Sequence, residues 1–576
     1  METKTNFKPN QKLKETVRVS GAEAVMLSLI EEGVDLMFGY VGGAIMPVYD
    51  ALYTHQDKIN HILVRHEQGA IHAAQGYARV KKKTGVCLAT SGPGATNLVT
   101  GLADAMLDST PLVCITGQVA GSYLGTDAFQ ETDIISITMA VTKWNFQIKK
   151  AEDIPETLAK AFHFARTGRP GPVLVDITKD AQFQELDYQY KKIVNVRSYI
   201  PYPKLNIDEI KAAADIINEA KNPLLLVGQG VLLSEAQDEL KTFIEKSGIP
   251  VASTLLGLSA FPSTHPLFMG MLGMHGNYGP NKVTNECDVL IAVGMRFDDR
   301  VTGNLNTYAK QAKVIHLELD KAEINKNVKV DVAINADAKQ ALTELTKYIN
   351  KKTYPKSIEK FEEYRQVEFE KIINGDLHPE SKLPKMGEVI NKVSEQTKGE
   401  AVVVTDVGQH QMSTARYYQF NKPHSLITSG GLGTMGFGLP AALGAKLGTD
   451  RDVVVFIGDG GFQMTIQELG TISQTKAPVK IILLNNGFLG MVRQWQDMFF
   501  DKRYSSVELT NPDFITIAKG YGISARRVSS HEELDGAIQQ MLEHDEAFLL
   551  EVVVEKEENV FPMVPAGGTV SDMMLE

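Results

Sequence analysis

Short runs of aliphatic and β-branched residues alternate with longer amphipathic stretches along most of the chain, and this alternation constrains the fold more than any other feature. Runs such as PLVCITG, PLLLVGQG and VKIILLNNG have the length and composition of buried strands, and the stretches between them are long enough for helices. Strands that alternate with helices in this way form parallel sheets with helices on both faces. The chain is therefore predicted to be an α/β protein made of three doubly wound parallel-sheet domains.

Two interruptions of the alternation suggest where the domains meet. The segment AQFQELDYQYKKIVNVRSYIPYPK has no clear period and contains two prolines, and KKTYPKSIEKFEEYRQVEFEK is densely charged and helix-like. We expect a first domain over residues 1–182, a linker over 183–204, a central domain over 205–352, a charged connector over 353–380 and a third domain over 381–576.

The composition argues against several classes of protein. The 576 residues carry a net charge of −11, whereas a nucleic-acid-binding protein usually has a positive charge. No stretch reaches the roughly 18 apolar residues that span a bilayer, and the polar start of the chain lacks the apolar core of a secretory signal. The three cysteines are scattered, and Cys87 and Cys114 lie in apolar runs as small buried residues would. We expect a cytoplasmic protein that binds neither nucleic acid nor membrane.

The most informative motif lies in residues 451–487. A buried strand over Val453–Ile457 runs into the turn Gly458–Gly461, and a second buried strand over Lys480–Leu484 runs into a pair of asparagines. Because a right-handed crossover makes these strands parallel, Asp459 and Asn486 both lie at carboxyl ends of strands, where ligands bind in open α/β sheets.

The side chains at these strand ends suit a magnesium–diphosphate site. A carboxylate and an amide oxygen are hard donors of the kind that Mg²⁺ prefers together with phosphate oxygens. Glycines beside the aspartate let the backbone approach a diphosphate, and the following helix N-terminus favours its negative charge. The alternative is a tight strand-to-helix turn followed by an unrelated hairpin-like turn at the asparagines. The spacing of the two pieces favours the magnesium–diphosphate site.

A GDG sequence, then 24 residues, then NN is similar to the signature of thiamine-diphosphate enzymes. The whole chain resembles the catalytic large subunit of biosynthetic acetolactate synthases (acetohydroxyacid synthases). That resemblance implies a pyrimidine-binding domain, a central domain and a diphosphate-binding domain. It also implies the condensation of pyruvate with a second pyruvate or with 2-ketobutyrate, with loss of CO₂, in branched-chain amino-acid biosynthesis.

Glu67 lies where an apolar strand ends and a helix begins, in LVRHEQGAIHAAQGYAR. A glutamate in the first turn of a helix is favourable with the helix dipole alone, so the position by itself does not require a function. The segment RHEQ resembles the family segment whose glutamate hydrogen-bonds N1′ of the aminopyrimidine. The resemblance therefore implies that Glu67 helps the cofactor's own 4′-nitrogen to act as a base.

Other segments resemble the family's cofactor-binding turns. VGQH resembles the turn that contacts the diphosphate, and Met435 in GLGTMGFG matches the methionine that supports the bent conformation of thiamine, although a lone methionine is commonly ordinary packing. Phe488 is implied to offer its backbone carbonyl to the metal beside Asp459 and Asn486. The implied thiamine-diphosphate residues are Glu67, Val407, Gly408, Gln409, His410, Met435, Gly458, Asp459, Gly460, Gly461, Asn486, Phe488 and Met491.

Substrate selection is implied for residues from three segments. In GFLGMVRQWQ, Trp495 resembles the tryptophan that favours 2-ketobutyrate as the second substrate, with Met491 and Val492 lining the same pocket. Arg300 in RFDDR is implied to hold the carboxylate of the second ketoacid, although charged residues after a strand are also typical of a solvated loop. The implied residues at the active-site entrance are Phe129, Gln130 and Lys179.

The central domain resembles the family's FAD-binding region, in which FAD has a structural role. The matching residues are Arg169, His275, Arg296, Glu318 and Asp337. This expectation comes from the resemblance alone, because no plain GxGxxG fingerprint follows a strand. Two departures from the family pattern also occur: Val41 in YVGGA and Ala120 in GQVAG stand where proline is common, so the herbicide sensitivity typical of the family is not expected to carry over.

Two other interpretations remain open from the sequence. One is a pyruvate oxidase or a 2-ketoacid decarboxylase of the same architecture, and the other is a non-catalytic nucleotide-binding or regulatory protein. Since Glu67 and the GDG–NN pair lie in different domains, the resemblance implies that the cofactor bridges two chains. We therefore expect a homodimer or a dimer of dimers, together with a small regulatory subunit.

Overall fold

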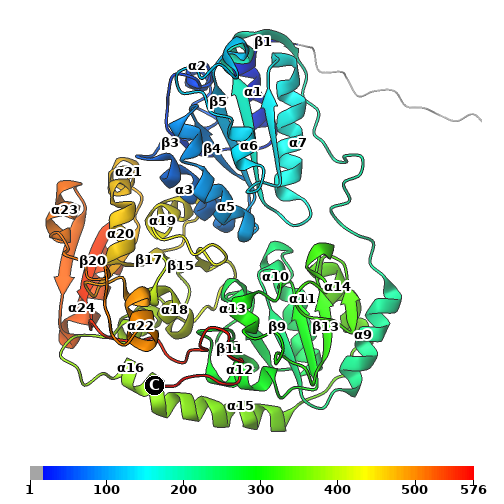
Figure 1. Ribbon diagram of the computed structural model, residues 1–576, viewed down its shortest axis with the longest axis vertical. Helices are drawn as coiled ribbons and strands as arrows, with labels where there is room; N and C mark the ends of the chain where they lie inside the picture. The colour runs from blue at the N-terminus through cyan, green and yellow to red at the C-terminus, as the bar shows by residue number, and fades with distance from the viewer. Residues whose placement is uncertain (1–16) are drawn as a thin grey trace, which may run out of the picture.

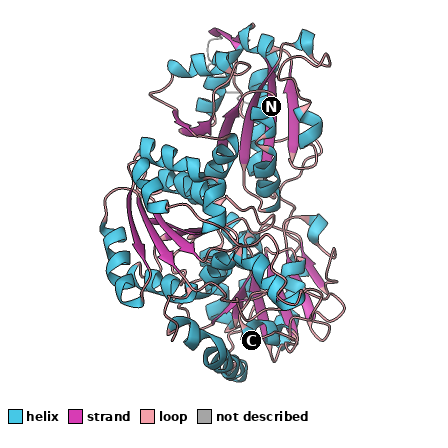
Figure 2. Ribbon diagram, turned by 60° about the vertical axis from the view of Figure 1, so that its left-hand side comes forward, coloured by secondary structure: helices cyan, strands magenta, loops and turns pink. Residues whose placement is uncertain are grey.

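The computed structural model describes residues 17–576 and contains three six-stranded parallel sheets, each in its own domain (Figure 1). The polar start of the chain, residues 1–16, lies outside the described residues. Each sheet has a hydrophobic cluster on both faces, since neighbouring residues of one strand, such as Val454 and Val455, belong to different clusters. Helices therefore cover both sides of every sheet, as the alternation predicts (Figure 2).

The first domain has the strand order β3-β2-β4-β5-β7-β6. Its strands are β2 (Leu36–Gly39), β3 (Asn60–Leu63), β4 (Gly85–Ala89), β5 (Leu112–Gln118), β6 (Trp144–Ile148) and β7 (Pro172–Thr178). Its helices are α1 (Gly21–Glu31), α2 (Met46–Tyr53), α3 (Glu67–Lys81), α4 (Pro93–Thr96), α5 (Val99–Leu107), α6 (Ile134–Thr138), α7 (Ile154–Arg166) and α8 (Lys179–Phe183). Cys87 and Cys114 are buried neighbours on adjacent strands, so the prediction of small packed residues is confirmed.

Part of the expected linker is structured. Residues Glu185–Tyr188 form β8, which pairs antiparallel with β1 (Val17–Ser20). Leu186 of β8 is buried in the core of the first domain, whereas its neighbours Glu185 and Asp187 are exposed. A four-residue strand with one buried apolar position gives too weak a pattern to be recognised in the sequence.

The central domain has the order β11-β10-β9-β12-β13-β14. Its strands are β9 (Pro223–Val227), β10 (Val251–Ser253), β11 (Phe268–Met271), β12 (Val289–Val293), β13 (Lys313–Leu317) and β14 (Val332–Ile334). Its helices are α9 (Ile207–Glu219), α10 (Gly230–Leu233), α11 (Gln237–Ser247), α12 (Tyr278–Thr284), α13 (Asp299–Thr302) and α14 (Ala338–Tyr348). The charged connector that follows is helical as predicted, with α15 (Pro355–Glu368), a π-turn (Phe369–Ile373) and α16 (Asn374–Leu377).

The third domain has the order β16-β15-β17-β18-β20-β19. Its strands are β15 (Val402–Thr405), β16 (Leu426–Ile427), β17 (Val453–Gly458), β18 (Lys480–Asn485), β19 (Ser524–Val528) and β20 (Phe548–Val553). Its helices are α17 (Met386–Gln396), α18 (Gln409–Tyr417), α19 (Gly438–Gly448), α20 (Asp459–Met464), α21 (Leu469–Thr475), α22 (Gly490–Phe499), α23 (Phe514–Gly520) and α24 (His531–Glu543). Residues 555–576, here called the C-terminal arm, then cross to the central domain, in red beside α12 in Figure 1.

The first and third domains meet along α3 and α19. Two glycines let the helix backbones touch, because a Cβ on Gly76 would overlap the carbonyl of Ala441 and one on Gly444 would overlap the carbonyl of Ala73. At the start of α3, the backbone N–H of Arg65 donates to Oε1 of Glu468 (3.0 Å). This contact fixes the position of the Glu67 helix relative to the third domain of the same chain.

Candidate functional site

Three neighbouring strands of the third domain end at one edge of the sheet, in the order β15, β17 and β18. Asp459 follows β17 and Asn486 follows β18, so the expected parallel pairing of these strands is confirmed. The two turns are in direct contact, since the backbone N–H of Gly487 donates to Oδ2 of Asp459 (2.9 Å). The same carboxylate oxygen also accepts a hydrogen bond from the amide of Asn511 (2.6 Å).

Both oxygen donors of this edge are buried. Asp459 is 1% exposed and Asn486 is 5% exposed. Burial raises the pKa of Asp459, whereas the hydrogen bonds from Asn511 and Gly487 lower it. The residues fit a hard divalent cation, because a carboxylate and an amide oxygen lie at adjacent buried strand ends.

The turn that follows β15 offers an unpaired nitrogen beside the same edge. His410 is buried, and its Nε2 has no hydrogen-bond partner among residues 17–576. A Cβ on Gly458 would lie 3.1 Å from the His410 ring, so the ring and the GDG turn are in close contact. Burial lowers the pKa of His410 to about 4, which leaves a neutral ring at pH 7. A buried polar atom without a partner, next to glycines, fits a bound phosphate group.

Asp406 holds the loop that carries Met435. Its carboxylate accepts hydrogen bonds from the backbone N–H groups of Gly438 (2.7 Å), Gly436 (3.1 Å) and Val407 (2.9 Å). The side chain is fully buried, and burial raises its pKa to about 6 although these N–H groups lower it. One carboxylate thus joins the end of β15 to the residues that follow Met435 in its loop.

Glu67 is the first residue of α3 and is mostly buried. The amide of Asn97 donates to its Oε2 (2.9 Å), and a Cβ on Gly94 would lie 3.3 Å from its Oε1. The glycine-rich segment that contains Gly94 also contacts Gln130, whose backbone lies about 3 Å from where a Cβ on Gly92 would be. The structure therefore brings Glu67 and Gln130 to the two sides of this segment.

The other two predicted entrance residues lie at the surface of the first domain. Phe129 is 87% exposed, and Lys179 is an exposed residue at the start of α8, directly after β7.

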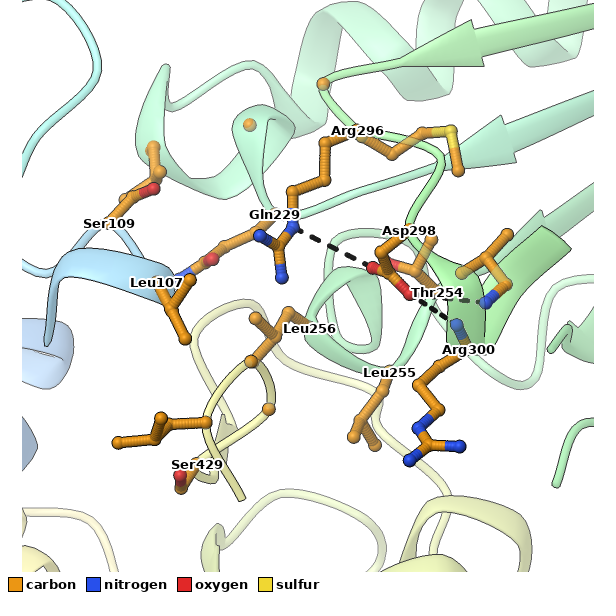
Figure 3. A pocket seen from close by; sticks show the side chains of 18 of the residues that line it. Leu107, Ser109, Gln229, Thr254, Leu255, Leu256, Arg296, Asp298, Arg300 and Ser429 are labelled. Atoms are coloured by element: carbon orange, nitrogen blue, oxygen red, sulfur yellow. Dashed lines mark hydrogen bonds and ion pairs between the residues drawn. The ribbon is translucent and has the colours of Figure 1, made fainter. Parts of the chain in front are cut away.

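A cavity of about 620 Å³ lies where the three domains meet, and Figure 3 shows part of its lining. On the third domain it is bordered by Val407, Gly408, Met435, Met491, Val492 and Trp495. On the other domains it is bordered by Arg169, His275, Arg296, Arg300, Glu318 and Asp337. The cavity thus joins Val407, Gly408, Met435 and the predicted acceptor residues of the third domain to the predicted FAD residues.

The side chains of some of the predicted FAD residues form hydrogen bonds or ion pairs within the chain, whereas one has a ring nitrogen without a partner in the described part of the chain. Asp337 caps α14 by accepting from the N–H of Lys339 (3.0 Å), and Arg169 is paired with Glu323 (2.9 Å) and Asp320. By contrast, His275 is buried and its Nδ1 has no partner among the described residues. Burial lowers its pKa to about 3 and raises the pKa of Glu318 to about 7. A large cavity with an unpaired buried nitrogen fits an additional organic group.

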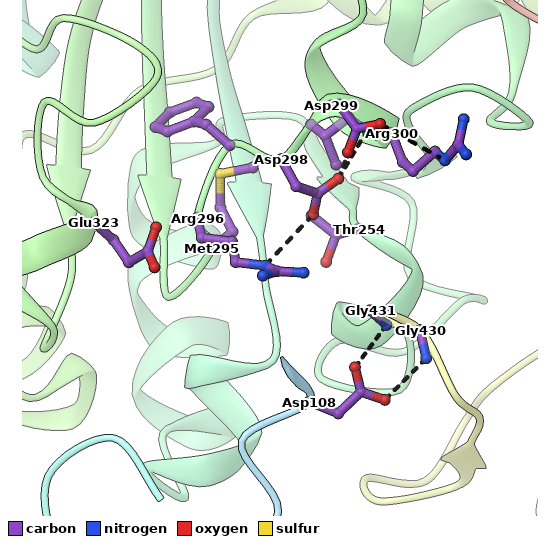
Figure 4. A network of polar contacts seen from close by, with 12 residues as sticks. Asp108, Thr254, Met295, Arg296, Asp298, Asp299, Arg300, Glu323, Gly430 and Gly431 are labelled. Atoms are coloured by element: carbon purple, nitrogen blue, oxygen red, sulfur yellow. Dashed lines mark hydrogen bonds and ion pairs between the residues drawn. The ribbon is translucent and has the colours of Figure 1, made fainter. Parts of the chain in front are cut away.

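Figure 4 shows hydrogen bonds between the first domain and the glycine pair Gly430–Gly431, which lines the cavity. Asp108 accepts hydrogen bonds from the N–H groups of Gly430 (2.9 Å) and Gly431 (2.7 Å) and is paired with Arg79 (3.0 Å). Arg296 and Asp298 face each other across 3.8 Å on the central side.

The cavity does not unite all the predicted residues. Of the described residues that line it, none is Glu67, Phe129, Gln130 or Lys179, and none is His410, Asp459 or Asn486. The sequence analysis also missed Asn97, Asp406, Asp108 and Asn511, which are the hydrogen-bond partners of predicted residues or of the loops that carry them. Asp406 lies directly before the quoted VGQH turn, whereas Asn97 and Asn511 lie outside the quoted motifs and make their contacts with residues distant in sequence.

Comparisons with known proteins agree with this geometry. Family models of thiamine pyrophosphate enzymes match the N-terminal TPP binding domain at residues 19–137, the central domain at 210–345 and the C-terminal TPP binding domain at 406–552. The chain is 48% identical to the acetolactate synthase large subunit of Corynebacterium glutamicum, over 96% of this chain and 90% of that protein. It is 45% identical to the acetolactate synthase isozyme 2 large subunit of Escherichia coli, over 96% of this chain and 99% of that protein. The chain therefore belongs to the acetolactate synthase large subunits, a group within the thiamine pyrophosphate enzyme family.

Proposed function

We propose that this protein condenses pyruvate with a second pyruvate or with 2-ketobutyrate, releasing CO₂, to form 2-acetolactate or 2-aceto-2-hydroxybutyrate. The observation that carries the proposal is the buried edge at which Asp459, Asn486 and His410 converge. The full-length likeness to acetolactate synthase large subunits supports this reaction within the thiamine pyrophosphate family. Its place is in branched-chain amino-acid biosynthesis.

Thiamine diphosphate, when bound, supplies a thiazolium ring that accepts the electrons released by decarboxylation. Asp459 and Asn486 would hold Mg²⁺ through side-chain oxygens and Phe488 through its backbone carbonyl, with the diphosphate oxygens completing the shell. The glycines of the GDG turn leave room for the diphosphate, and the unpaired Nε2 of His410 would face it. Met435 would support the ring system, with its loop held by Asp406.

Glu67 would hold a proton at N1′ of the aminopyrimidine. Glu67 is the first residue of α3, and the amide of Asn97 donates a hydrogen bond to one of its carboxyl oxygens. This hydrogen bond orients the carboxyl. By holding the proton at this atom, Glu67 would be the side chain of this site that supports the cofactor's base chemistry.

The second ketoacid would bind between α22 and α13. Trp495, Met491 and Val492 offer apolar contact to its side chain, and Arg300 offers a charged guanidinium to its carboxylate. An extra methylene against an aromatic wall contributes about 1 kcal/mol, which is enough to favour 2-ketobutyrate. FAD would occupy the adjoining part of the cavity beside His275 and Arg296 as a structural group.

We also infer a homodimer in which Glu67 of one chain faces the diphosphate turn of its partner. The placement of Glu67 in the first domain and of Asp459 and Asn486 in the third, together with the full-length likeness to acetolactate synthase large subunits, supports this assignment. Because the similar proteins are named large subunits, a small subunit is a further expected partner.

The decisive experiment incubates the protein with pyruvate, Mg²⁺, thiamine diphosphate and FAD, omitting each in turn. Acetolactate should form only with Mg²⁺ and thiamine diphosphate present, and loss of FAD should reduce activity without any oxygen being consumed. Oxygen uptake with pyruvate and no acetolactate would identify an oxidase instead. The absence of both turnover and a thermal shift with thiamine diphosphate would exclude an enzyme of this family.

Among the described residues, no helix is long and apolar enough to cross a membrane.

A further inference from the structure

The helix α22 has two sides with different surroundings. Met491, Val492 and Trp495 line the main cavity, whereas Arg493 and Gln494 are buried on the other side, at 1% and 0% exposed. The proposed reaction gives neither of these buried polar residues a role. Because buried polar side chains are costly without hydrogen bonds, their partners show what this side of the helix is built to hold.

The oxygen and the nitrogen of the Gln494 side-chain amide both form hydrogen bonds with the same residue of the C-terminal arm. Its Oε1 accepts from the backbone N–H of Val560 (2.9 Å), and its Nε2 donates to the carbonyl of Val560 (3.1 Å). The same Oε1 also accepts from Nε2 of Gln409 (3.0 Å), the residue between Gly408 and His410. One side chain therefore connects the acceptor helix, the arm and the turn at the diphosphate edge.

The neighbouring residues reinforce this attachment. Arg493 donates through Nη2 to the carbonyl of Glu558 (2.7 Å) and to Oδ1 of Asn559 (2.6 Å). Asn559 in turn donates to Oδ2 of Asp497 (2.9 Å), one turn further along α22. Residues 558–560 are thus bonded to the helix along its buried side.

Beyond this attachment, the arm reaches the segment that carries Arg300. The N–H of Val564 donates to the carbonyl of Met274 (2.8 Å), and the N–H of Met274 donates to the carbonyl of Arg300 (2.7 Å). Further on, the N–H of Asn304 donates to the carbonyl of Gly568 (2.9 Å). The arm therefore spans from the helix of Trp495 to the helix of Arg300, the two walls of the proposed acceptor pocket.

We propose that Gln494 is a positioning residue for acceptor selection: by fastening α22 to the C-terminal arm, it sets the distance between Trp495 and Arg300. The inference rests on the proposed function, since it assumes that these two residues contact the second ketoacid. Gln494 itself touches neither substrate. Its effect should fall on the choice of the second ketoacid and not on the consumption of the first.

The variant Gln494→Glu tests this with little change of shape. A carboxylate still accepts from the N–H of Val560, but it cannot donate to the carbonyl of Val560, so two oxygen atoms face each other in a buried site. The matched control is Gln496→Glu, because Gln496 pairs in the same way with the backbone of Ser505 (2.9 and 3.0 Å) away from the arm. Asn559→Ala is a second variant that loosens the arm from its own side.

The measurement is the ratio of 2-aceto-2-hydroxybutyrate to acetolactate formed from an equimolar mixture of pyruvate and 2-ketobutyrate. Gln494→Glu should lower this ratio by about fivefold, Asn559→Ala should lower it less, and the rate with pyruvate alone should stay within about twofold. Gln496→Glu should leave the ratio unchanged. Lowering the pH should partly restore the ratio in Gln494→Glu, because a protonated carboxyl can donate to Val560 again.

The outcomes separate this inference from the proposed function. If Trp495→Leu lowers the ratio but Gln494→Glu and Asn559→Ala do not, the role of Gln494 is refuted and the pocket stands. A loss of pyruvate turnover in Gln494→Glu with an unchanged ratio also refutes it. If Trp495→Leu itself leaves the ratio unchanged, the pocket assignment fails and the inference fails with it.

Discussion

A single carboxyl, that of Glu67, carries the proton-holding role in the proposed site, and its surroundings suit that role. Its partner Asn97 is neutral, so the carboxyl is oriented without being neutralised by a cation. The variant Glu67→Gln keeps the shape and the hydrogen bond to position 97 but cannot hold the proton. We expect turnover to fall by about 100-fold or more, with the thermal unfolding midpoint unchanged.

Steady-state acetolactate formation and thermal unfolding measure the two effects of this change. Glu185→Gln is the control, since Glu185 is an exposed residue paired with Arg18. Turnover of Glu67→Gln close to that of the unaltered protein would remove the proposed proton role.

Asp406 supports the Met435 loop by accepting hydrogen bonds from the backbone N–H groups of Gly436 and Gly438. In Asp406→Asn one acceptor oxygen becomes a donor, so at least one N–H of the loop is left facing another N–H in a buried site. We expect the thiamine diphosphate concentration for half-maximal activity to rise about tenfold, which corresponds to about 1.4 kcal/mol. Asp452→Asn, an exposed position at the opposite end of β17, is the control, and an unchanged cofactor requirement in Asp406→Asn would contradict the role of this loop.

At the scale of elements, the contact between α3 and α19 fixes the first domain against the third. Gly444 allows the closest approach, because a Cβ there would overlap the backbone carbonyl of Ala73. Gly444→Ala should therefore lower the free energy of unfolding by about 1–3 kcal/mol despite the higher helix propensity of alanine. Gly536→Ala, on the exposed side of α24 with no atom near its Cβ position, should be neutral or slightly stabilising. Urea unfolding compares the two, and equal effects would show that the helices have room to separate.

The same contact makes the chain sensitive to acid through His72. Its ring lies edge-on to Phe437, the N-cap residue of α19, with centroids 5.2 Å apart, and burial together with Arg79 lowers its pKa to about 3. Since the unfolded pKa is about 6.5, the unfolded chain binds one more proton between these values, and stability falls as the pH drops below 6.5. The loss from His72 amounts to about 2 kcal/mol between pH 6.5 and pH 5.

His72→Gln should remove this part of the pH dependence in urea unfolding at the two pH values. His531→Gln is a control of opposite sign, because the backbone of Ser381 and the carboxylate of Glu388 raise the pKa of His531, so its contribution is lost as the pH rises. An unchanged pH dependence in His72→Gln would show that the ring is protonated in the folded chain.

For the whole molecule, the sequence predicts the individual helices and strands better than the contacts between elements that are distant in sequence. Strand–helix alternation and the GDG–NN spacing predict the three sheets and the edge where Asp459 meets Asn486, because these depend on local pattern and on the handedness of the crossover. The strand β8 and the partner Asn511 were missed, since each depends on a contact distant in sequence. The relation between Glu67 and the turn of Asp459 depends on how domains and chains pack, which local pattern does not predict, and neither residue lines the cavity between the three domains.

The central claim is that each active site combines Glu67 of one chain with Asp459 and Asn486 of another. Mixing Glu67→Gln with Asp459→Asn, each inactive alone, tests it most directly. After unfolding and refolding together, half of the dimers should be mixed, and each mixed dimer should contain one site with both altered residues and one intact site, which gives about a quarter of normal activity. No activity above that of the separate variants, in mixtures shown to contain mixed dimers, would contradict a site shared between chains.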